Sequence, residues 1–465
     1  MLFQPYYLDC LAHASYMIAS GGLAAVVDPQ RDVDLYTEDA QRLGLRIAYV
    51  IETHLHADFV SGHRELAERT GAEIFIGARA EATFAHHAVA DGETLSFGDV
   101  RMRFLETPGH TVEGISIVVT DVEKSEFPQL VLTGDTLFIG DVGRPDLSRG
   151  RTPAELAAMM YDSLHRKLLT LSDDVEVYPA HGAGSLCGRA MSEARSSTIG
   201  EQRRTNAALQ YADREAFVAA LTTDLPERPA YFSRDAEINR GGAPAIAPRG
   251  GFVRLSSRDV ARARDGGALV LDVRDADAFA RAHVPGSINI ALSGQFASWA
   301  GSVVGLDADV IIVADDDERI EEARLRLSRV GIDRVLGVLD GGIREWGRAG
   351  AAVQTTAQLH PGELADQIDC GRVRQVVDVR RSGEWDEGHL PRAQHRPLDR
   401  LATSLQGLDP ILPTAIYCAG GYRSSIGASI LQKLGFRDVR NLVGGYTAWH
   451  DAGLATETPA PAPVG

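Results

Sequence analysis

The alternation of apolar and polar positions along the chain predicts an α/β protein. Short apolar runs typical of buried strands alternate with stretches whose apolar residues recur at helical spacing. In the first part of the chain, the predicted strands are 6–11, 15–20, 23–28, 47–52, 73–76, 100–105, 115–120, 130–133 and 175–178, and the predicted helices are 35–43 and 63–70. A helical pattern returns at 197–221, is broken by Pro226 and Pro229, and gives way to an expected linker at 239–251.

Four of these strands lead into loops that carry histidine or aspartate beside glycine or proline. The loops are His54-Leu55-His56-Ala57-Asp58, Pro108-Gly109-His110-Thr111, Thr133-Gly134-Asp135 and Tyr178-Pro179-Ala180-His181. Loops at strand ends commonly carry function, and imidazole with carboxylate suits zinc or non-haem iron. A single histidine in such a place is more often structural, but four loops in succession favour a metal site.

The pattern after residue 250 contains an internal repeat. The stretches 271–274, 283–286 and 341–346 recur as 377–380, 389–392 and 444–449, about 100 residues further on, which is an ordinary domain length. Each copy alternates short apolar strands with helices, so each is expected to form a doubly wound α/β sheet. We therefore expect a first domain at 1–245, two homologous domains at 252–353 and 358–456, and a disordered tail at 457–465.

The second copy holds a candidate nucleophile. A predicted strand at 415–417 opens into the loop Cys418-Ala419-Gly420-Gly421-Tyr422-Arg423, which is followed by a helix. Backbone N–H groups at the start of a helix stabilise an anionic sulfur, and the two glycines let the loop curl around it. The aligned loop of the first copy, residues 314–319, has no nucleophile and four acidic side chains. This first copy is predicted to be catalytically inactive, serving as a spacer, a dimerisation surface or a docking platform.

Composition narrows the classes of partner. The 465 residues carry a formal net charge of -17 with 44% hydrophobic residues, which argues against nucleic acid and anionic membranes as partners. No apolar stretch approaches the ~18 residues of a membrane span, and no signal peptide is recognisable at the N-terminus. Four cysteines in so long a chain do not form a disulfide framework, so a cytoplasmic location is expected.

The four histidine and aspartate loops resemble the metal-binding motifs of the metallo-β-lactamase superfamily. This resemblance implies an αβ/βα sandwich with metal at one edge of two facing sheets. Two-metal members such as glyoxalase II carry a histidine where this chain has Phe59, so the persulfide dioxygenase branch is the more similar one. That branch implies one Fe(II) held by His54, His110 and Asp135, with His56, Asp58 and His181 orienting these ligands or the substrate. Zinc is the alternative metal.

Two further features near this site stay open. The loop Gly143-Arg144-Pro145-Asp146 is interpreted equally well as a structural salt bridge or as a substrate contact. Cys187 is more simply a small buried residue in a glycine-rich turn than a sulfur relay or sensor.

The second repeat resembles a rhodanese domain over its whole length, from Asp378-Val379-Arg380 to Gly444-Gly445-Tyr446 and Trp449. The resemblance implies that Cys418 carries a transferable persulfide sulfur and that residues 419–423 bind its anionic group. Together the two resemblances imply sulfide detoxification: O₂-dependent oxidation of a thiol persulfide to sulfite, and sulfur transfer that yields thiosulfate.

Several alternatives remain at this point. The thiol could be glutathione or coenzyme A, sulfur could flow between the two sites in either direction, and a homo-oligomer is compatible with the sequence. A competing hypothesis is a zinc thioesterase of glyoxalase II type fused to an independent sulfurtransferase. A third is a sulfur-relay or sensing scaffold without catalysis at the metal.

Overall fold

The computed structural model describes residues 1–211, 213–225, 227–246, 248 and 250–459. The chain divides into two compact units, the first comprising Met1–Ala247 with Leu327–Gly331 and the second comprising Pro248–Arg326 and Ile332–Gly465. Among the described residues, no helix has both the length and the apolar character needed to cross a membrane.

Two six-stranded sheets form the first unit. The first sheet contains, in spatial order, β1 (Leu2–Leu8), β2 (His13–Ser20), β3 (Leu23–Val27), β4 (Arg46–Glu52), β5 (Glu73–Gly77) and β6 (His87–Val89). The second contains β12 (Ser197–Thr198), β11 (Glu176–Pro179), β10 (Leu130–Gly134), β9 (Ile115–Asp121), β8 (Val100–Glu106) and β7 (Thr94–Phe97). Apolar side chains of both sheets, among them Ile18, Phe75, Phe104 and Ile117, meet in one buried core between them.

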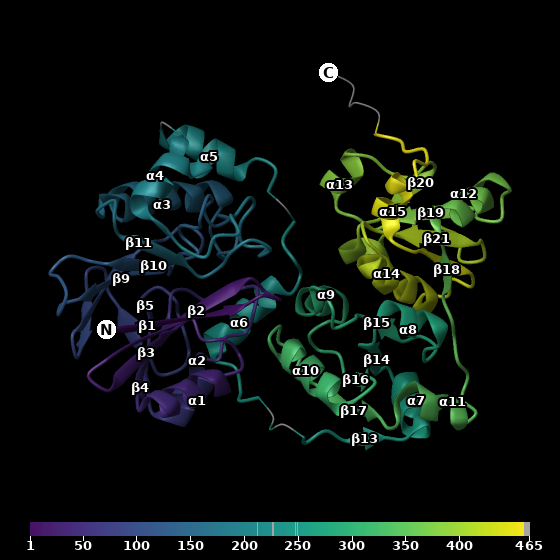
Figure 1. The fold of residues 1–465 in the computed structure, drawn as a ribbon, viewed down its shortest axis with the longest axis horizontal. Helices are drawn as coiled ribbons and strands as arrows, with labels where there is room; N and C mark the ends of the chain where they lie inside the picture. Colours follow the sequence, from purple (N-terminus) through teal and green to yellow (C-terminus); the bar gives the residue numbers. More distant parts are fainter. Residues whose placement is uncertain (212, 226, 247, 249, 460–465) are drawn as a thin grey trace. The chain divides into compact units, whose positions relative to one another are not determined.

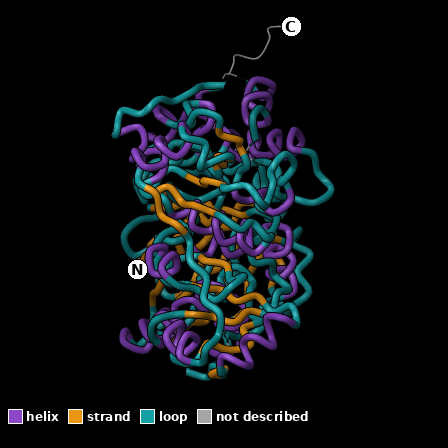
Figure 2. Tube along the Cα trace, turned by 90° about the vertical axis from the view of Figure 1, so that its right-hand side faces the viewer, coloured by secondary structure: helices purple, strands orange, loops and turns teal. Residues whose placement is uncertain are grey.

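Helices cover the outer faces of these sheets. On the first sheet, α1 (Asp34–Leu43) and α2 (His63–Thr70) bury Tyr36 and Leu66 against strand residues. On the second lie α3 (Pro153–Arg166), η1 (Leu168–Thr170), α4 (Ile199–Thr205), η2 (Ala207–Gln210) and α5 (Arg214–Thr222). Figure 1 shows these helices on either side of the strands, and Figure 2 shows the strands in orange running among purple helices. The predicted αβ/βα sandwich is confirmed.

Several details of the first unit differ from the sequence prediction. Strand β1 begins at Leu2 rather than residue 6, and the prediction lacked β6, β7, β12 and α3. The stretch 197–221, predicted as one helix, contains the short strand β12 followed by three short helical elements, α4, η2 and α5. The expected linker at 239–251 was wrong at its start, because Asn239–Gly241 are the last turn of α6 (Phe232–Gly241).

The second unit contains two five-stranded sheets with the same strand order. The first sheet is ordered β13 (Arg254–Leu255), β17 (Val335–Leu339), β16 (Val310–Val313), β14 (Leu269–Asp272) and β15 (Ile288–Asn289). The second is ordered β18 (Ala357–Leu359), β22 (Val439–Leu442), β21 (Thr414–Tyr417), β19 (Gln375–Asp378) and β20 (Ala393–His395). All the strand pairs described in these sheets are parallel. The predicted duplication of an α/β domain is therefore confirmed.

The helices of the two copies follow the same plan. The first copy has α7 (Ser257–Asp265), α8 (Ala276–Arg281), α9 (Phe296–Val303), α10 (Asp317–Ser328) and α11 (Gly342–Arg348), and the second has α12 (Pro361–Asp369), α13 (Ser382–Asp386), η3 (Leu398–Thr403), α14 (Tyr422–Lys433) and α15 (Gly445–Asp451). Trp346 and Trp449 are buried at equivalent places, and their indole N–H groups donate to the carbonyls of Ala352 and Ala455. The repeated Gly-Gly motif thus ends in a tryptophan that anchors the last helix of each copy.

The end of the second copy is more ordered than the sequence suggests. The backbones of Glu457 and His389 exchange two hydrogen bonds of 2.8 Å. The disordered tail expected at 457–465 was therefore wrong at Glu457, while residues 460–465 of that tail lie outside the described residues.

Candidate metal centre and cysteine loop

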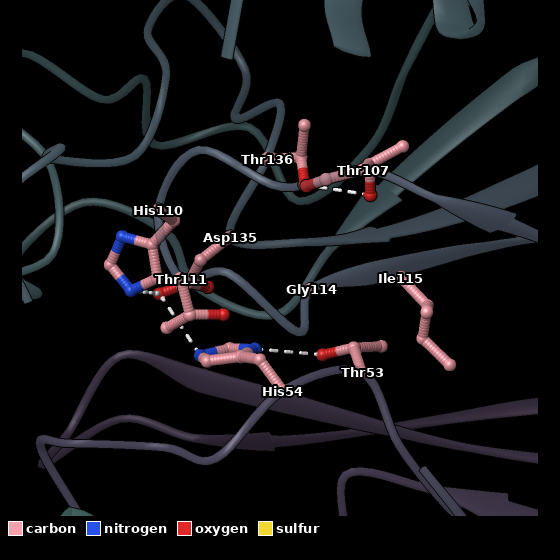
Figure 3. Close-up of a pocket in the computed structure, with 9 residues that line it drawn as sticks. All are labelled: Thr53, His54, Thr107, His110, Thr111, Gly114, Ile115, Asp135 and Thr136. Carbon is pink, nitrogen blue, oxygen red and sulfur yellow. Dashed lines mark hydrogen bonds and ion pairs between the residues drawn. The ribbon is translucent and has the colours of Figure 1, made fainter. Parts of the chain in front are cut away.

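His54, His110 and Asp135 converge at one edge of the first unit, although they are far apart in sequence. They follow β4, β8 and β10, and all three are buried. Nε2 of His54 lies 3.8 Å from Oδ2 of Asp135, and Nε2 of His110 lies 3.4 Å from the same oxygen. Figure 3 shows the two rings and the carboxylate facing one another in a small hollow. One ligand atom from each residue could bind the same metal ion.

Hydrogen bonds fix which nitrogen of each histidine is available. Nδ1 of His110 lies 3.0 Å from the carbonyl oxygen of Arg144, which can only accept, so this nitrogen carries the proton. The hydroxyl of Thr53 donates to Asp28, so it accepts from Nδ1 of His54 at 2.9 Å. Both Nε2 atoms therefore hold lone pairs, and neither has a hydrogen-bond partner among the described residues. Such orphaned, buried nitrogens fit a metal ion.

The protonation states support the same conclusion. Burial lowers the pKa of His54 and of His110, so both rings are neutral near pH 7. Burial alone would raise the pKa of Asp135, but the nearby His181, His110 and His54 outweigh it and hold this pKa well below its usual range. Two neutral imidazoles and one carboxylate are a donor set suited to Zn²⁺ or Fe(II).

His181 links two carboxylates at this edge. Its Nδ1 lies 2.8 Å from Oδ1 of Asp135 and its Nε2 lies 2.9 Å from Oδ2 of Asp58. Burial alone would lower the pKa of His181, but Asp135 and Asp58 outweigh burial and raise it well above its usual value. A positively charged ring whose Nδ1–H donates to Asp135 holds this carboxylate in a fixed orientation. The structure thus brings His181 and Asp58 to the place that the sequence suggested.

His56 lies on the other side of His54. Its Nε2 is 3.2 Å from Oδ1 of Asp28 and 3.8 Å from Oε2 of Glu52. Asp28 also accepts the hydroxyl of Thr53 and so connects His56 indirectly to His54. Burial raises the pKa of Glu52 to about 8. His56 is therefore placed to orient His54 through Asp28 and Thr53, and it lies in a buried cluster that sequence reasoning did not identify.

Asn239 is a residue at this site that sequence reasoning missed. Its side-chain amide is fully buried, donates to the carbonyls of His56 and Phe59 at 2.7 and 2.8 Å, and accepts from the N–H of Ser61 at 2.8 Å. One amide thus satisfies three backbone groups of the loop that carries His54. No local sequence signal identifies it, because it follows two prolines and precedes glycines, a context typical of linkers.

Phe59 occupies the position where two-metal relatives carry a histidine. Its side chain is buried, and its ring centroid lies 4.2 Å from that of His13 and 4.4 Å from that of His56. Neither ring nitrogen of His13 has a hydrogen-bond partner among the described residues. The Phe59 ring therefore packs against His13 and His56, and its centroid lies 6.4 Å from that of His181.

The loop after the metal-edge aspartate is a structural support. Nε and Nη2 of Arg144 donate to the two carboxylate oxygens of Asp146, at 2.7 and 2.9 Å, and the carbonyl of Arg144 accepts from His110. Gly143 is required here, because an added Cβ would overlap the carbonyl oxygen of Asp135. The salt-bridge interpretation of this loop is confirmed, and the substrate contact stays a prediction. Cys187 is buried nearby, and burial raises the pKa of its thiol well above the usual value.

The cysteine loop of the second copy is shaped around Cys418. The thiol is buried at the end of β21, and the N–H of Gly421 donates to its sulfur at 3.1 Å. The guanidinium of Arg423 forms two hydrogen bonds of 2.6 Å with the carboxylate of Glu384. Burial alone would lower the pKa of Arg423, but Glu384 and, more weakly, Cys418 outweigh it and raise this pKa. The arginine charge is therefore shared between Glu384 and the cysteine loop, where backbone N–H groups also support an anion.

The backbone at Gly445 packs directly against the cysteine loop. The N–H groups of Tyr446 and Thr447 donate to the carbonyls of Cys418 and Ala419 at 2.7 and 3.0 Å. Gly445 has φ of +59°, and an added Cβ would overlap both carbonyl oxygens.

We expect Gly445→Ala to displace the cysteine loop and to lower the stability of the second unit by about 2 kcal/mol or more, because steric overlap adds to the cost of positive φ. Thermal unfolding of the full chain would measure this. The matched control is Gly453→Ala, where φ is +67° but nothing lies within 4 Å of the added Cβ. Equal losses from the two variants would contradict the role given to Gly445.

The aligned loop of the first copy has a different surface. Ala314 is buried at the end of β16, and Asp315, Asp316 and Asp317 are exposed. Asp317 pairs with Arg254 at 2.6 Å. This loop has no thiol and no cradle of glycines.

The fold and the converging side chains define a metallo-β-lactamase-type unit followed by two rhodanese-like domains. A family model described as Metallo-beta-lactamase superfamily matches residues 8–181, and one described as Rhodanese-like domain matches residues 257–349 and 360–452. The chain belongs to the metallo-β-lactamase superfamily and carries two rhodanese-like domains at its C-terminal side.

Three similar proteins show the range of the superfamily. Persulfide dioxygenase ETHE1, mitochondrial, of Bos taurus is 30% identical over 209 residues, which are 44% of this chain and 73% of that protein. Hydroxyacylglutathione hydrolase of Rhizobium johnstonii is 35% identical over 163 residues, which are 34% of this chain and 57% of that protein. A crystal structure described as a metallo-beta-lactamase from Staphylococcus aureus subsp. aureus COL has a TM-score of 0.66 and 30% identity, and the match covers 73% of this chain and 98% of that one.

Proposed function

We propose that this protein oxidises a low-molecular-weight thiol persulfide at the His54, His110 and Asp135 centre and transfers persulfide sulfur through Cys418. The observation that carries the first part is the convergence of two orphaned Nε2 atoms and one carboxylate, in a chain whose Phe59 stands where two-metal relatives carry a histidine. The named persulfide dioxygenase among the similar proteins supports the same assignment.

The donor set fits one Fe(II) per chain, held by His54, His110 and Asp135. When bound at such a two-histidine, one-carboxylate site, Fe(II) supplies redox chemistry with O₂ and open coordination positions for small ligands. The chain supplies the rest: Thr53 and Arg144 fix the tautomers of the two histidines, and His181 fixes the orientation of Asp135. Burial of all these groups excludes bulk water from the reacting sulfur.

The proposed reactions balance. In the first, a persulfide R–S–S–H reacts with O₂ and water to give the thiol R–SH, sulfite and two protons. The terminal sulfur loses four electrons, which O₂ accepts. In the second, the Cys418 thiolate attacks the outer sulfur of another persulfide and releases a thiolate, and sulfite then takes that sulfur from Cys418 to give thiosulfate. All four cysteines of the chain are free, which suits the reducing cytoplasm in which we propose that it acts.

The test is metal analysis of protein purified without oxygen, followed by O₂ uptake with glutathione persulfide and with coenzyme A persulfide. We expect about one iron per chain, with uptake that requires a persulfide and yields sulfite. The competing hypothesis is a zinc thioesterase, favoured by the similar hydroxyacylglutathione hydrolase. Two zinc ions per chain with hydrolysis of an acylglutathione thioester would overturn our proposal.

Phe59 provides a sharper test of the mononuclear centre. We expect Phe59→His to raise the metal bound after zinc reconstitution from about one to about two ions per chain, because the new imidazole would join Asp58 and His181. Phe59→Leu removes the ring without adding a ligand and should leave the stoichiometry unchanged. Two ions bound by the unaltered protein would show that Phe59 does not block the second position.

A further inference from the structure

Helix α14, which follows the cysteine loop, is buried on nearly all sides. Ser424, Ser425 and every residue from Ile426 to Leu431 are buried, although the sequence of this helix is not uniformly apolar. One face packs on its own sheet, where a Cβ added to Gly427 would press on Ile416. The serines Ser425 and Ser429 face β15, the edge strand of the inactive first copy.

Asn289, the last residue of β15, joins the two copies. Its side-chain carbonyl accepts from the hydroxyl of Ser425 at 2.6 Å, and its backbone N–H donates to the hydroxyl of Ser429 at 3.0 Å. Its side-chain N–H₂ donates to the carbonyls of Asp272 and Arg274 within the first copy. Asn289 is 1% exposed, so these bonds form away from water, where losing one is costly.

Comparison of the two copies separates two kinds of hydrogen bond made by Asn289. Its counterpart in the second copy is His395, which caps the carbonyl of Arg380 through Nε2 at 2.9 Å, just as Asn289 caps the equivalent carbonyl of Arg274. Capping a strand-end carbonyl is thus common to both copies. The bond particular to the first copy is the one in which Oδ1 of Asn289 accepts from Ser425 of the second copy.

A second contact holds the loop itself. The hydroxyl of Tyr422, within the Cys418 loop, donates to the carbonyl of Ala291 at 2.9 Å. A Cβ added to Gly294 would come within 3.3 Å of the Tyr422 ring, so the ring packs closely on this glycine. Arg326 of α10 donates to the carbonyl of Leu292 at 2.6 Å and so supports the segment that receives Tyr422.

We propose that the inactive first copy is a positioning element of the sulfur-transfer site: Asn289 and Ala291 hold α14 and Tyr422 so that the loop N–H groups face the sulfur of Cys418. This inference deepens the role proposed for Cys418 and rests on it. The loss of a nucleophile from the first copy does not affect this task, because the contacts come from β15 and the segment after it, not from the loop at 314–319.

The test measures alkylation of Cys418 by iodoacetamide as a function of pH in the full chain, read by mass spectrometry of the Cys418 peptide. Ser425→Ala and Tyr422→Phe each remove one hydroxyl that bonds to the first copy. We expect each to raise the midpoint pH of alkylation by about half a unit or more, which is about a three-fold loss of thiolate at lower pH. Ser302→Ala, which removes a hydroxyl bonded within α9 alone, should leave the midpoint unchanged.

A double-mutant cycle supplies the decisive comparison. Asn289→Ala should shift the midpoint by itself but add little in the Ser425→Ala background, since both remove the same bond. Additive shifts, or an unchanged midpoint in folded Ser425→Ala and Tyr422→Phe, would overturn the inference. If Asn289→Ala does not fold, the alkylation midpoints of Ser425→Ala and Tyr422→Phe still test the inference. Alkylation requires no sulfur transfer, so an unaltered protein that alkylates normally but transfers no sulfur would refute the proposed function alone.

Discussion

Cys418→Ser should abolish thiosulfate formation from persulfide and sulfite while leaving O₂ uptake with glutathione persulfide unchanged. Serine preserves the shape of the loop but has no thiolate, so transfer should fall by about 10³-fold or more. The proposed site of O₂ uptake belongs to a separate compact unit and shares no residue with the cysteine loop. Coupled assays of thiosulfate and of dissolved O₂ on the same samples would measure both activities.

The matched control is Cys370→Ser, because Cys370 is an exposed free thiol in the same domain as Cys418. It should leave both activities intact. If Cys418→Ser lost O₂ uptake with a supplied persulfide as well, the two sites would not be separable. Supplying thiosulfate and thiol in place of persulfide also tests the direction of sulfur flow between the two sites. O₂ uptake that then requires Cys418 would mean that sulfur flows toward the proposed metal site.

His110→Ala should remove the bound metal and with it O₂ uptake, while sulfur transfer by Cys418 persists. The ring supplies one of two buried lone pairs at the centre, and its Nε2 lies 3.4 Å from Oδ2 of Asp135. Loss of a partner behind a metal ligand typically costs 10–100-fold, so loss of a ligand itself should exceed about 100-fold. Metal content and O₂ uptake would be measured on the same preparation.

The control for this variant is His450→Ala, which removes an exposed histidine far along the chain. Retention of stoichiometric metal by His110→Ala would contradict the assigned ligand set. A variant that lost thiosulfate formation from supplied sulfite and persulfide would indicate general misfolding instead.

The main features of the fold follow from patterns that the sequence carries locally. Strand ends with histidine or aspartate marked the metal edge, and a repeat of whole motifs marked the two rhodanese-like domains. Both kinds of signal are periodic or repeated, so one chain suffices to find them. The sequence analysis did not predict helix α6, because prolines and glycines surround it. Its packing depends on hydrogen bonds from Asn239 to a loop that is far away in sequence.

Contacts between side chains that are distant in sequence could not be predicted either. Arg423 looks like a free charge beside the nucleophile until Glu384 is seen to pair with it. By residue type alone His54 and His56 are equal candidates for a metal ligand, and only the family resemblance separated them. The structure adds that Nε2 of His56 lies 3.2 Å from Oδ1 of Asp28. Spacing along the chain identifies which groups can gather at an edge, whereas their orientation depends on hydrogen bonds between segments.

The hydrogen bonds of the Asn239 amide affect the order in which the first unit folds during synthesis. Chains are synthesised from the N-terminus, so the loop at His56 and Phe59 leaves the ribosome long before the residue that satisfies its carbonyls. Until α6 docks, that loop carries unpaired backbone groups that water must solvate. Completion of the loop therefore comes late in synthesis, after α6 and after the segment Leu327–Gly331, whose Arg329 carbonyl accepts from the N–H of Val60.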